Sequence, residues 1–196
     1  PALLIRLLRR HALALVAGGR LRVVREALGW LAAHSCDDDA WLAGLGVFVH
    51  LEAGDGPATQ ALLDRVDGLW PADPSADLVA LRERVRIRLA VADGTVDAGV
   101  LDAVVAAVDG GQQADPDEPA LAIMSQLERA TLLTIAARTD DALRIAGTAL
   151  DRARALGHGL LVAQAYTVLA YTAATVGDYR RMTEMAERAD HDAGPS

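Results

Sequence analysis

Four arginines occupy alternate positions of one short stretch, and only one acid interrupts them. They are Arg82, Arg84, Arg86 and Arg88, with Glu83 as the acid. In a helix, i, i+4 spacing places Arg82 with Arg86 on one stripe and Arg84 with Arg88 on another. Such guanidinium groups can bind an anion or an acidic peptide, or they can pair with acids of a neighbouring segment. We favour internal pairing and keep Arg84 and Arg88 as candidates for contacting an anionic partner.

Other residue types that carry catalysis or bind metals are scattered along the chain. No two histidines stand at the i, i+4 spacing of a metal site. The adjacent acids at 37–39 lack the spacing of a calcium loop and suit the N-cap of a helix. Neither a phosphate-binding glycine loop nor a Gly-x-Ser-x-Gly motif occurs. We therefore expect no enzyme, no metal and no cofactor, and a helical enzyme is the most distant alternative.

The composition indicates closely packed helices. Residues of the AVILMFWYC class make up 52% of the chain, whereas aromatic residues make up only 4%. The net charge of −8 argues against direct contact with nucleic acid. The single cysteine, Cys36, excludes an internal disulfide and indicates a cytoplasmic chain. The uncharged run at 155–177 is long enough to span a membrane, but its polar residues and terminal turn favour a buried helix.

Hydrophobic periodicity predicts ten helices arranged as five hairpins. The expected pairs are 2–17 with 21–33, 40–53 with 57–66, 75–91 with 95–108, 120–137 with 140–156, and two helices within 159–189. Residues 109–119 combine glycine, proline and acids, which predicts an internal loop. The turns at Gly18, Asp55, Asp93, Asp140 and Asp178 recur about every 38 residues except across that loop.

The stretch from 165 to 189 shows the hairpin pattern most fully. Its first half places Tyr166, Leu169, Ala170 and Ala173 on one helical face, and its second half places Tyr179, Met182, Ala186 and Ala189 on another. Gly177 can adopt the left-handed conformation that ends a helix, and the following aspartate can cap the next one.

This stretch resembles the tetratricopeptide repeats. The matching positions are Tyr166, Leu169, Ala170, Gly177, Asp178, Tyr179, Ala186 and Ala189. Ala173 replaces an aromatic residue that is common in the family, and Met182 stands where alanine is commonest. The resemblance implies an all-α, right-handed superhelical solenoid of five antiparallel helix hairpins, forming a single domain over 1–196.

A second resemblance concerns the larger context. The segments RRHALALVAGGRLRVVREALGWLA and AWLAGLGVFVHLEAGDGPATQALLDRV are similar to the helical-repeat region of MalT-type LuxR-family transcriptional regulators. In that family a nucleotide-binding domain precedes the repeats and a DNA-binding domain follows them. The resemblance implies a piece of a longer protein that receives a signal.

We therefore expect a module that binds a protein or peptide partner, and the alternative is a sensor domain for a small-molecule inducer. With Tyr166 and Leu169 directed inward, Gln164, Thr167 and Tyr171 lie on the opposite side of their helix, which we expect to face the binding groove. No membrane contact is expected, and homo-oligomerisation remains open.

Overall fold

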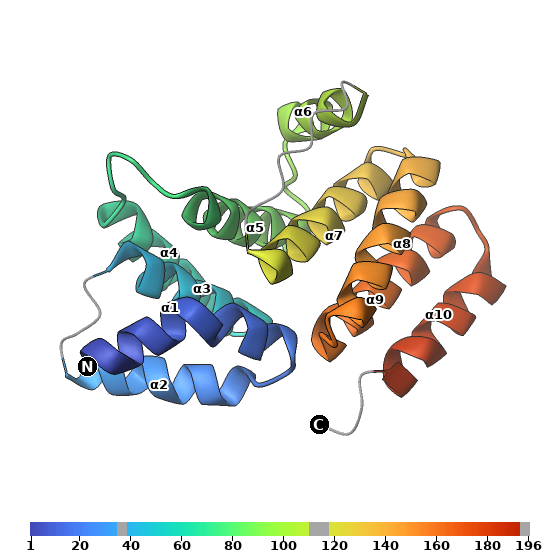
Figure 1. Cartoon of the computed structure of the whole chain (residues 1–196). Coiled ribbons are helices and arrows are strands. Elements are labelled where there is room, and N and C mark those ends of the chain that lie inside the picture. The colour runs from blue at the N-terminus through green and yellow to red at the C-terminus, as the bar shows by residue number, and fades with distance from the viewer. Residues whose placement is uncertain (35–38, 110–117, 193–196) are drawn as a thin grey trace. The chain divides into compact units, whose positions relative to one another are not determined.

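The computed structural model describes residues 1–34, 39–109 and 118–192, and most of these residues are helical. Over these three ranges the chain has ten helices and no strand. The helices are α1 Ala2–Ala17, α2 Leu21–Ala33, α3 Ala40–Glu52, α4 Gly56–Gly68, α5 Ala76–Ala92, α6 Ala98–Asp109, α7 Pro119–Ile135, α8 Thr139–Ala155, α9 Gly159–Thr175 and α10 Tyr179–Asp192 (Figure 1). The expected all-α fold is confirmed.

Acidic side chains fix the start of several helices. The carboxylate of Asp39 accepts hydrogen bonds from the backbone N–H groups of Trp41 and Leu42, each at 3.0 Å, and caps α3. Asp97 accepts one from the N–H of Gly99 at 2.7 Å, so α6 begins later than the periodicity predicted. The capping role predicted for the acids at 37–39 is confirmed for Asp39, whereas 37 and 38 lie outside the described residues.

The expected loop at 109–119 lies mostly outside the described residues, which resume at Glu118. The Glu118 carboxylate accepts a hydrogen bond from the N–H of Leu121 at 2.7 Å, and Pro119 occupies the first turn of α7. Asp109 is the last residue of α6. Both borders of the expected loop therefore belong to helix ends.

The chain divides into two compact units, Pro1–Leu89 and Ala90–Ser196. In the first unit α1 packs against α2 and α3, α2 packs against α3, and α3 packs against α4. One buried apolar cluster consists of Ala43, Val47, Leu63, Val66 and Val85. The last of these residues lies on α5, so the cluster joins α5 to α3 and α4.

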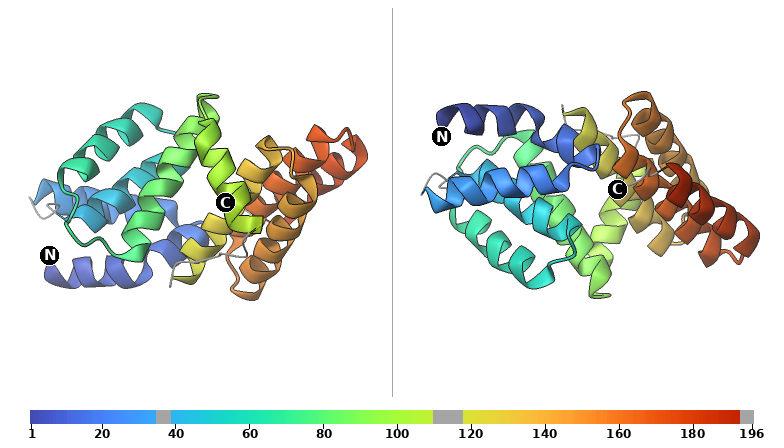
Figure 2. Two further views of the ribbon diagram at one scale, coloured as in Figure 1. Left: turned by 90° about the horizontal axis from the view of Figure 1, so that it is seen from above. Right: turned by 90° about the horizontal axis from the view of Figure 1, so that it is seen from below.

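In the second unit each helix packs against its successor, and α7 also packs against α9. Helix α9 lies between α8 and α10 (Figure 2). A stripe of fully buried alanines runs along α8 at positions 142, 146, 149 and 153. Because alanine has only a methyl side chain, this stripe lets neighbouring helices approach closely.

In the α9–α10 hairpin the residues predicted to face the interior are buried on α9 but not on α10. Tyr166, Leu169, Ala170 and Ala173 are all buried on α9. By contrast, 67% of Tyr179 is exposed at the start of α10, and Ala186 is also exposed. The reason is that α10 packs on α9, with no similar packing on its other side among the described helices.

Helix α9 accounts for most of the uncharged run at 155–177. Eight of its residues are buried. Within the described part of the chain, no helix combines the length and the apolar character that crossing a membrane requires. The burial of α9 agrees with the interpretation of this run as an internal helix.

The reversal between α9 and α10 depends on a left-handed residue. Gly177 has φ +78°, as the sequence predicted. The N–H of Asp178 donates to the carbonyl of Ala173 at 3.0 Å, and the N–H of Gly177 donates to that of Ala174 at 3.0 Å. These two bonds satisfy carbonyls that the end of a helix leaves free.

The turn between α7 and α8 has the same backbone arrangement but lacks the glycine. Ala137 has φ +58°, and among the described residues no other non-glycine residue has a positive φ. The N–H of Arg138 donates to the carbonyl of Leu133 at 2.8 Å, which repeats the bond that Asp178 makes. The sequence placed this turn at Thr139-Asp140, but both residues belong to α8.

Exchanging the residue types at these two turns should shift stability in opposite directions. We expect Ala137→Gly to raise the free energy of unfolding by about 0.5–1 kcal/mol, because it relieves the left-handed strain of an L-residue. Gly177→Ala should lower it by about 1 kcal/mol, since nothing lies within 4 Å of the added methyl group and only the backbone is strained. Urea unfolding of both variants measures this, and a loss of stability in Ala137→Gly would contradict it.

Candidate functional site

The four arginines of α5 form the two predicted stripes, and each stripe pairs with one acid of the first unit. Arg84 Nη2 lies 3.0 Å and Arg88 Nη1 lies 3.4 Å from the same carboxylate oxygen of Glu52 on α3. Arg82 and Arg86 both pair with Asp67 on α4, at 2.7 and 3.0 Å. The acids therefore come from the preceding hairpin, which is the internal pairing that the sequence favoured.

The pair between Arg84 and Glu52 is buried. Their side chains are 1% and 5% exposed, and the Arg84 guanidinium also lies 5.4 Å from the centre of the Phe48 ring. Arg84 is thus part of the interior and does not offer its charge to a partner in solution. Arg88 is 35% exposed at the edge of the same pair.

Arg82 and Arg86, which we call the outer stripe, keep Asp67 ionised. Burial alone would raise the pKa of Asp67, but hydrogen bonds and charge attraction from Arg82 and Arg86 outweigh it and lower the pKa below its usual value. Arg82 also lies 4.2 Å from the centre of the Trp70 ring. Two arginines of the run therefore stabilise the end of α4.

Removing one partner should distinguish the buried pair from the exposed one. Glu52→Gln should lower the free energy of unfolding by about 3 kcal/mol, because it leaves the buried charge of Arg84 without its carboxylate. The matched change Asp67→Asn on the outer stripe should lower it by no more than about 1 kcal/mol. Chemical denaturation measures both values, and equal effects would contradict the buried pairing.

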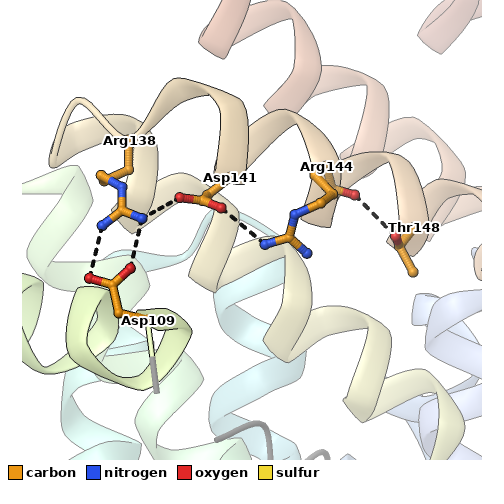
Figure 3. A network of polar contacts seen from close by, with 5 residues as sticks. All are labelled: Asp109, Arg138, Asp141, Arg144 and Thr148. Carbon is orange, nitrogen blue, oxygen red and sulfur yellow. Dashed lines mark hydrogen bonds and ion pairs between the residues drawn. The ribbon is translucent and has the colours of Figure 1, made fainter. Parts of the chain in front are cut away.

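A second polar network joins α6 to the start of α8 (Figure 3). The Arg138 guanidinium donates to both carboxylate oxygens of Asp109, at 3.2 and 2.8 Å, and to Asp141 at 2.5 Å. Arg144 donates to the other oxygen of Asp141 at 3.0 Å. Since none of the side chains of α6 is fully buried, this network is a substantial part of what holds the end of that helix.

The network lowers the pKa of both carboxyl groups. The hydrogen bond from Arg138 lowers the pKa of Asp109, and those from Arg144 and then Arg138 lower the pKa of Asp141. Both acids are therefore ionised at neutral pH, and their charges offset those of the two arginines. No sequence pattern predicts this network, because Asp109 lies on α6, 29 positions before Arg138 at the start of α8.

The remaining candidates lie together on α9, on the side away from the buried residues. Tyr171 is 45% exposed, Thr167 is exposed and Gln164 is half-buried. They follow i, i+3, i+7 spacing and so occupy one face. The Thr167 hydroxyl donates to the carbonyl of Ala163 at 3.0 Å, which leaves its oxygen able to accept from a ligand. We call these three residues the α9 surface.

The buried side of α9 is itself fixed by polar contacts. Arg154 of α8 donates a hydrogen bond to the Tyr166 hydroxyl and places its guanidinium 5.4 Å from the ring centre. The hydroxyls of Thr172 and Thr134 lie 2.7 Å apart and link α9 to α7. These contacts hold α9 in one rotational setting, so they also determine which residues face outward.

The candidate residues thus fall into two groups. Arg84 and Arg88 meet on Glu52 in the first unit, and the α9 surface belongs to the second unit. Among the described residues, no three His, Cys, Asp or Glu side chains converge as a metal site requires, and Cys36 lies outside those residues. Comparison of the chain with protein-family models, with curated proteins and with solved structures finds no match.

Proposed function

We propose that this chain is a non-catalytic helical-repeat module that binds a protein or peptide partner through the α9 surface. Tandem helical hairpins present extended surfaces while their cores maintain the shape. In the α9 surface an exposed aromatic ring supplies contact area, and hydroxyl and amide groups supply orientation. Arg84 has no place in this surface because it is buried against Glu52.

The observation that carries the proposal is the direct packing of α7 against α9. These two helices precede equivalent left-handed turns, at Ala137 and Gly177, and they pack against each other, with the hydroxyls of Thr134 and Thr172 2.7 Å apart. The first helices of two successive hairpins thus pack directly on each other, which supports a tetratricopeptide-like solenoid. In such a solenoid the first helices of the hairpins line the concave face, where α9 would present Tyr171.

The resemblance to MalT-type LuxR-family regulators suggests where this module acts. There it would serve as the interaction region of a multidomain transcriptional regulator and would leave nucleotide and DNA binding to other domains. A longer reading frame that encodes a P-loop ahead of the repeats and a helix-turn-helix after them would support this placement.

A small-molecule sensor is the second candidate function. The observation that favours it is a cavity between α2, α3 and α4 of the first unit, lined by apolar side chains, two arginines and a histidine. Its mixed lining is typical of sites for small ligands.

Selection from a displayed random-peptide library tests the peptide-binding proposal. We expect the chain to select a peptide motif, and Tyr171→Ala to weaken the binding of the selected peptides about tenfold or more, as the loss of an interface tyrosine commonly does. Tyr179→Ala is the matched control, because it removes an even more exposed tyrosine from α10. It should leave affinity unchanged.

Fluorescence anisotropy with a labelled selected peptide gives the affinities. Thermal melts should show that both variants remain folded, since both side chains are largely exposed. Failure to select any motif, or equal losses of affinity in the two variants, would contradict binding at the α9 surface.

A further inference from the structure

The cavity of the first unit has a volume of about 200 Å³ and is partly open to solvent. Its walls are mainly aliphatic and include Leu28 of α2, Leu42 and Val49 of α3 and Leu62 of α4. For comparison, a dry cavity of about 150 Å³ is enough to bind benzene. The space therefore suits an apolar body of roughly six to eight carbon atoms.

Two glycines inside helices line this space, the exposed Gly29 of α2 and the half-buried Gly46 of α3. A Cβ at Gly29 would meet nothing within 4 Å, and one at Gly46 would meet only Leu62 Cδ1, at an ordinary 3.8 Å. Packing thus does not require glycine at either position, although each glycine destabilises its helix by about 0.5–1 kcal/mol relative to alanine.

Gly44 on the same helix provides the contrast. A Cβ there would lie 3.3 Å from Leu81 Cδ2 and 3.4 Å from Leu78 Cδ1, so close packing against α5 explains that glycine. No such neighbour explains Gly29 and Gly46. At Gly46 the missing side chain leaves room between α3 and Leu62 of α4, which also lines the cavity.

The polar groups of the cavity are all potentially cationic. Arg25, His50 and Arg65 line it, and none of the described lining residues is acidic. The excess of basic over acidic residues in the lining contrasts with the net charge of the chain, which is −8. Arg65 already takes part in other interactions within the protein, and His50 has Asp55 at 3.4 Å.

Arg25 lies near the mouth, because it is exposed and still lines the cavity. It belongs to the first half of α2, and His50 belongs to the last turn of α3. Since α2 and α3 pack against each other and run in opposite directions (Figure 1), the two residues lie toward the same end of the cavity. Two of the three basic side chains therefore lie toward one end of an apolar space, whereas Arg65, in the last turn of α4, lies toward the other end.

We propose that this cavity binds a small carboxylic acid with an apolar body, with its carboxylate at Arg25 and its hydrocarbon part against the leucines. A guanidinium binds a carboxylate through paired hydrogen bonds, and burial of the hydrocarbon adds to the affinity. This inference gives a site and a ligand class to the sensor function named above as the second candidate. It does not depend on the α9 surface.

Titration of the whole chain with octanoate and phenylacetate, followed by calorimetry or ligand-observed NMR, tests the proposal. We expect a Kd below about 1 mM for at least one of the two acids, which is reasonable for ligands of this size. The corresponding neutral amides, octanamide and phenylacetamide, should bind at least about tenfold more weakly, because they cannot form the charge-assisted bond.

Two pairs of variants locate the site. Gly46→Leu should fill the cavity and abolish binding, whereas Gly147→Leu, on α8 with nothing within 4 Å of the new Cβ, should bind as the parent chain does. Arg25→Gln should weaken binding of the acid about fivefold or more and leave binding of the amide unchanged. The control Arg22→Gln changes a neighbouring, highly exposed arginine that does not line the cavity, and should have no effect.

Absence of binding by both acids, equal binding of acid and amide, or unchanged binding in both Gly46→Leu and Arg25→Gln would overturn the proposal. If Gly46→Leu does not fold, Arg25→Gln decides alone, because its side chain is exposed. Tyr171→Ala should bind the acids normally, so failure of this proposal is distinguishable from failure of the peptide-binding proposal.

Discussion

Tight reversals of the chain after α7 and after α9 determine how the helices of the second unit pack. Each reversal within a hairpin is completed in a few residues, and in the second unit one residue in the left-handed region makes it. The helices joined by the α7–α8 and α9–α10 reversals pack closely against each other. The packing in turn requires small or well-fitted side chains at the contact, which is the role of the alanine stripe on α8.

This packing gives α9 two unlike faces. On one face Tyr166 and Thr172 are buried and held by Arg154 and Thr134, so the helix cannot rotate about its axis without breaking those contacts. On the other face Tyr171 remains exposed. The interior of the second unit therefore determines which residues a partner could meet, and the proposed binding surface follows from that rigidity.

Local patterns in the sequence predicted local structure well. The bounds of α1 and α2 agree with their apolar periodicity, and the left-handed turn at Gly177 follows from the residue type. Ala137 could not be found in this way, because alanine carries no signal for a positive φ and only its tertiary setting imposes one.

The sequence could not predict features that depend on contacts between residues far apart in the chain. The i, i+4 stripes of the arginine run were predicted, but the burial of Arg84 depends on Glu52, which lies 32 positions away on another helix. The cavity was missed for a related reason, since its lining residues come from three different helices, α2, α3 and α4. The position of the α9 surface on its helix followed from the helical period, while its role in binding is a proposal.

The proposed function requires that a partner binds the outward face of α9. Mapping of amide chemical-shift changes in ¹⁵N-labelled protein on addition of a selected peptide tests it most directly, because the map does not depend on any substitution. We expect the largest changes at Gln164, Thr167 and Tyr171 and at neighbouring residues of α7. Changes that cluster instead on α10 around Tyr179, or on the first unit alone, would contradict it.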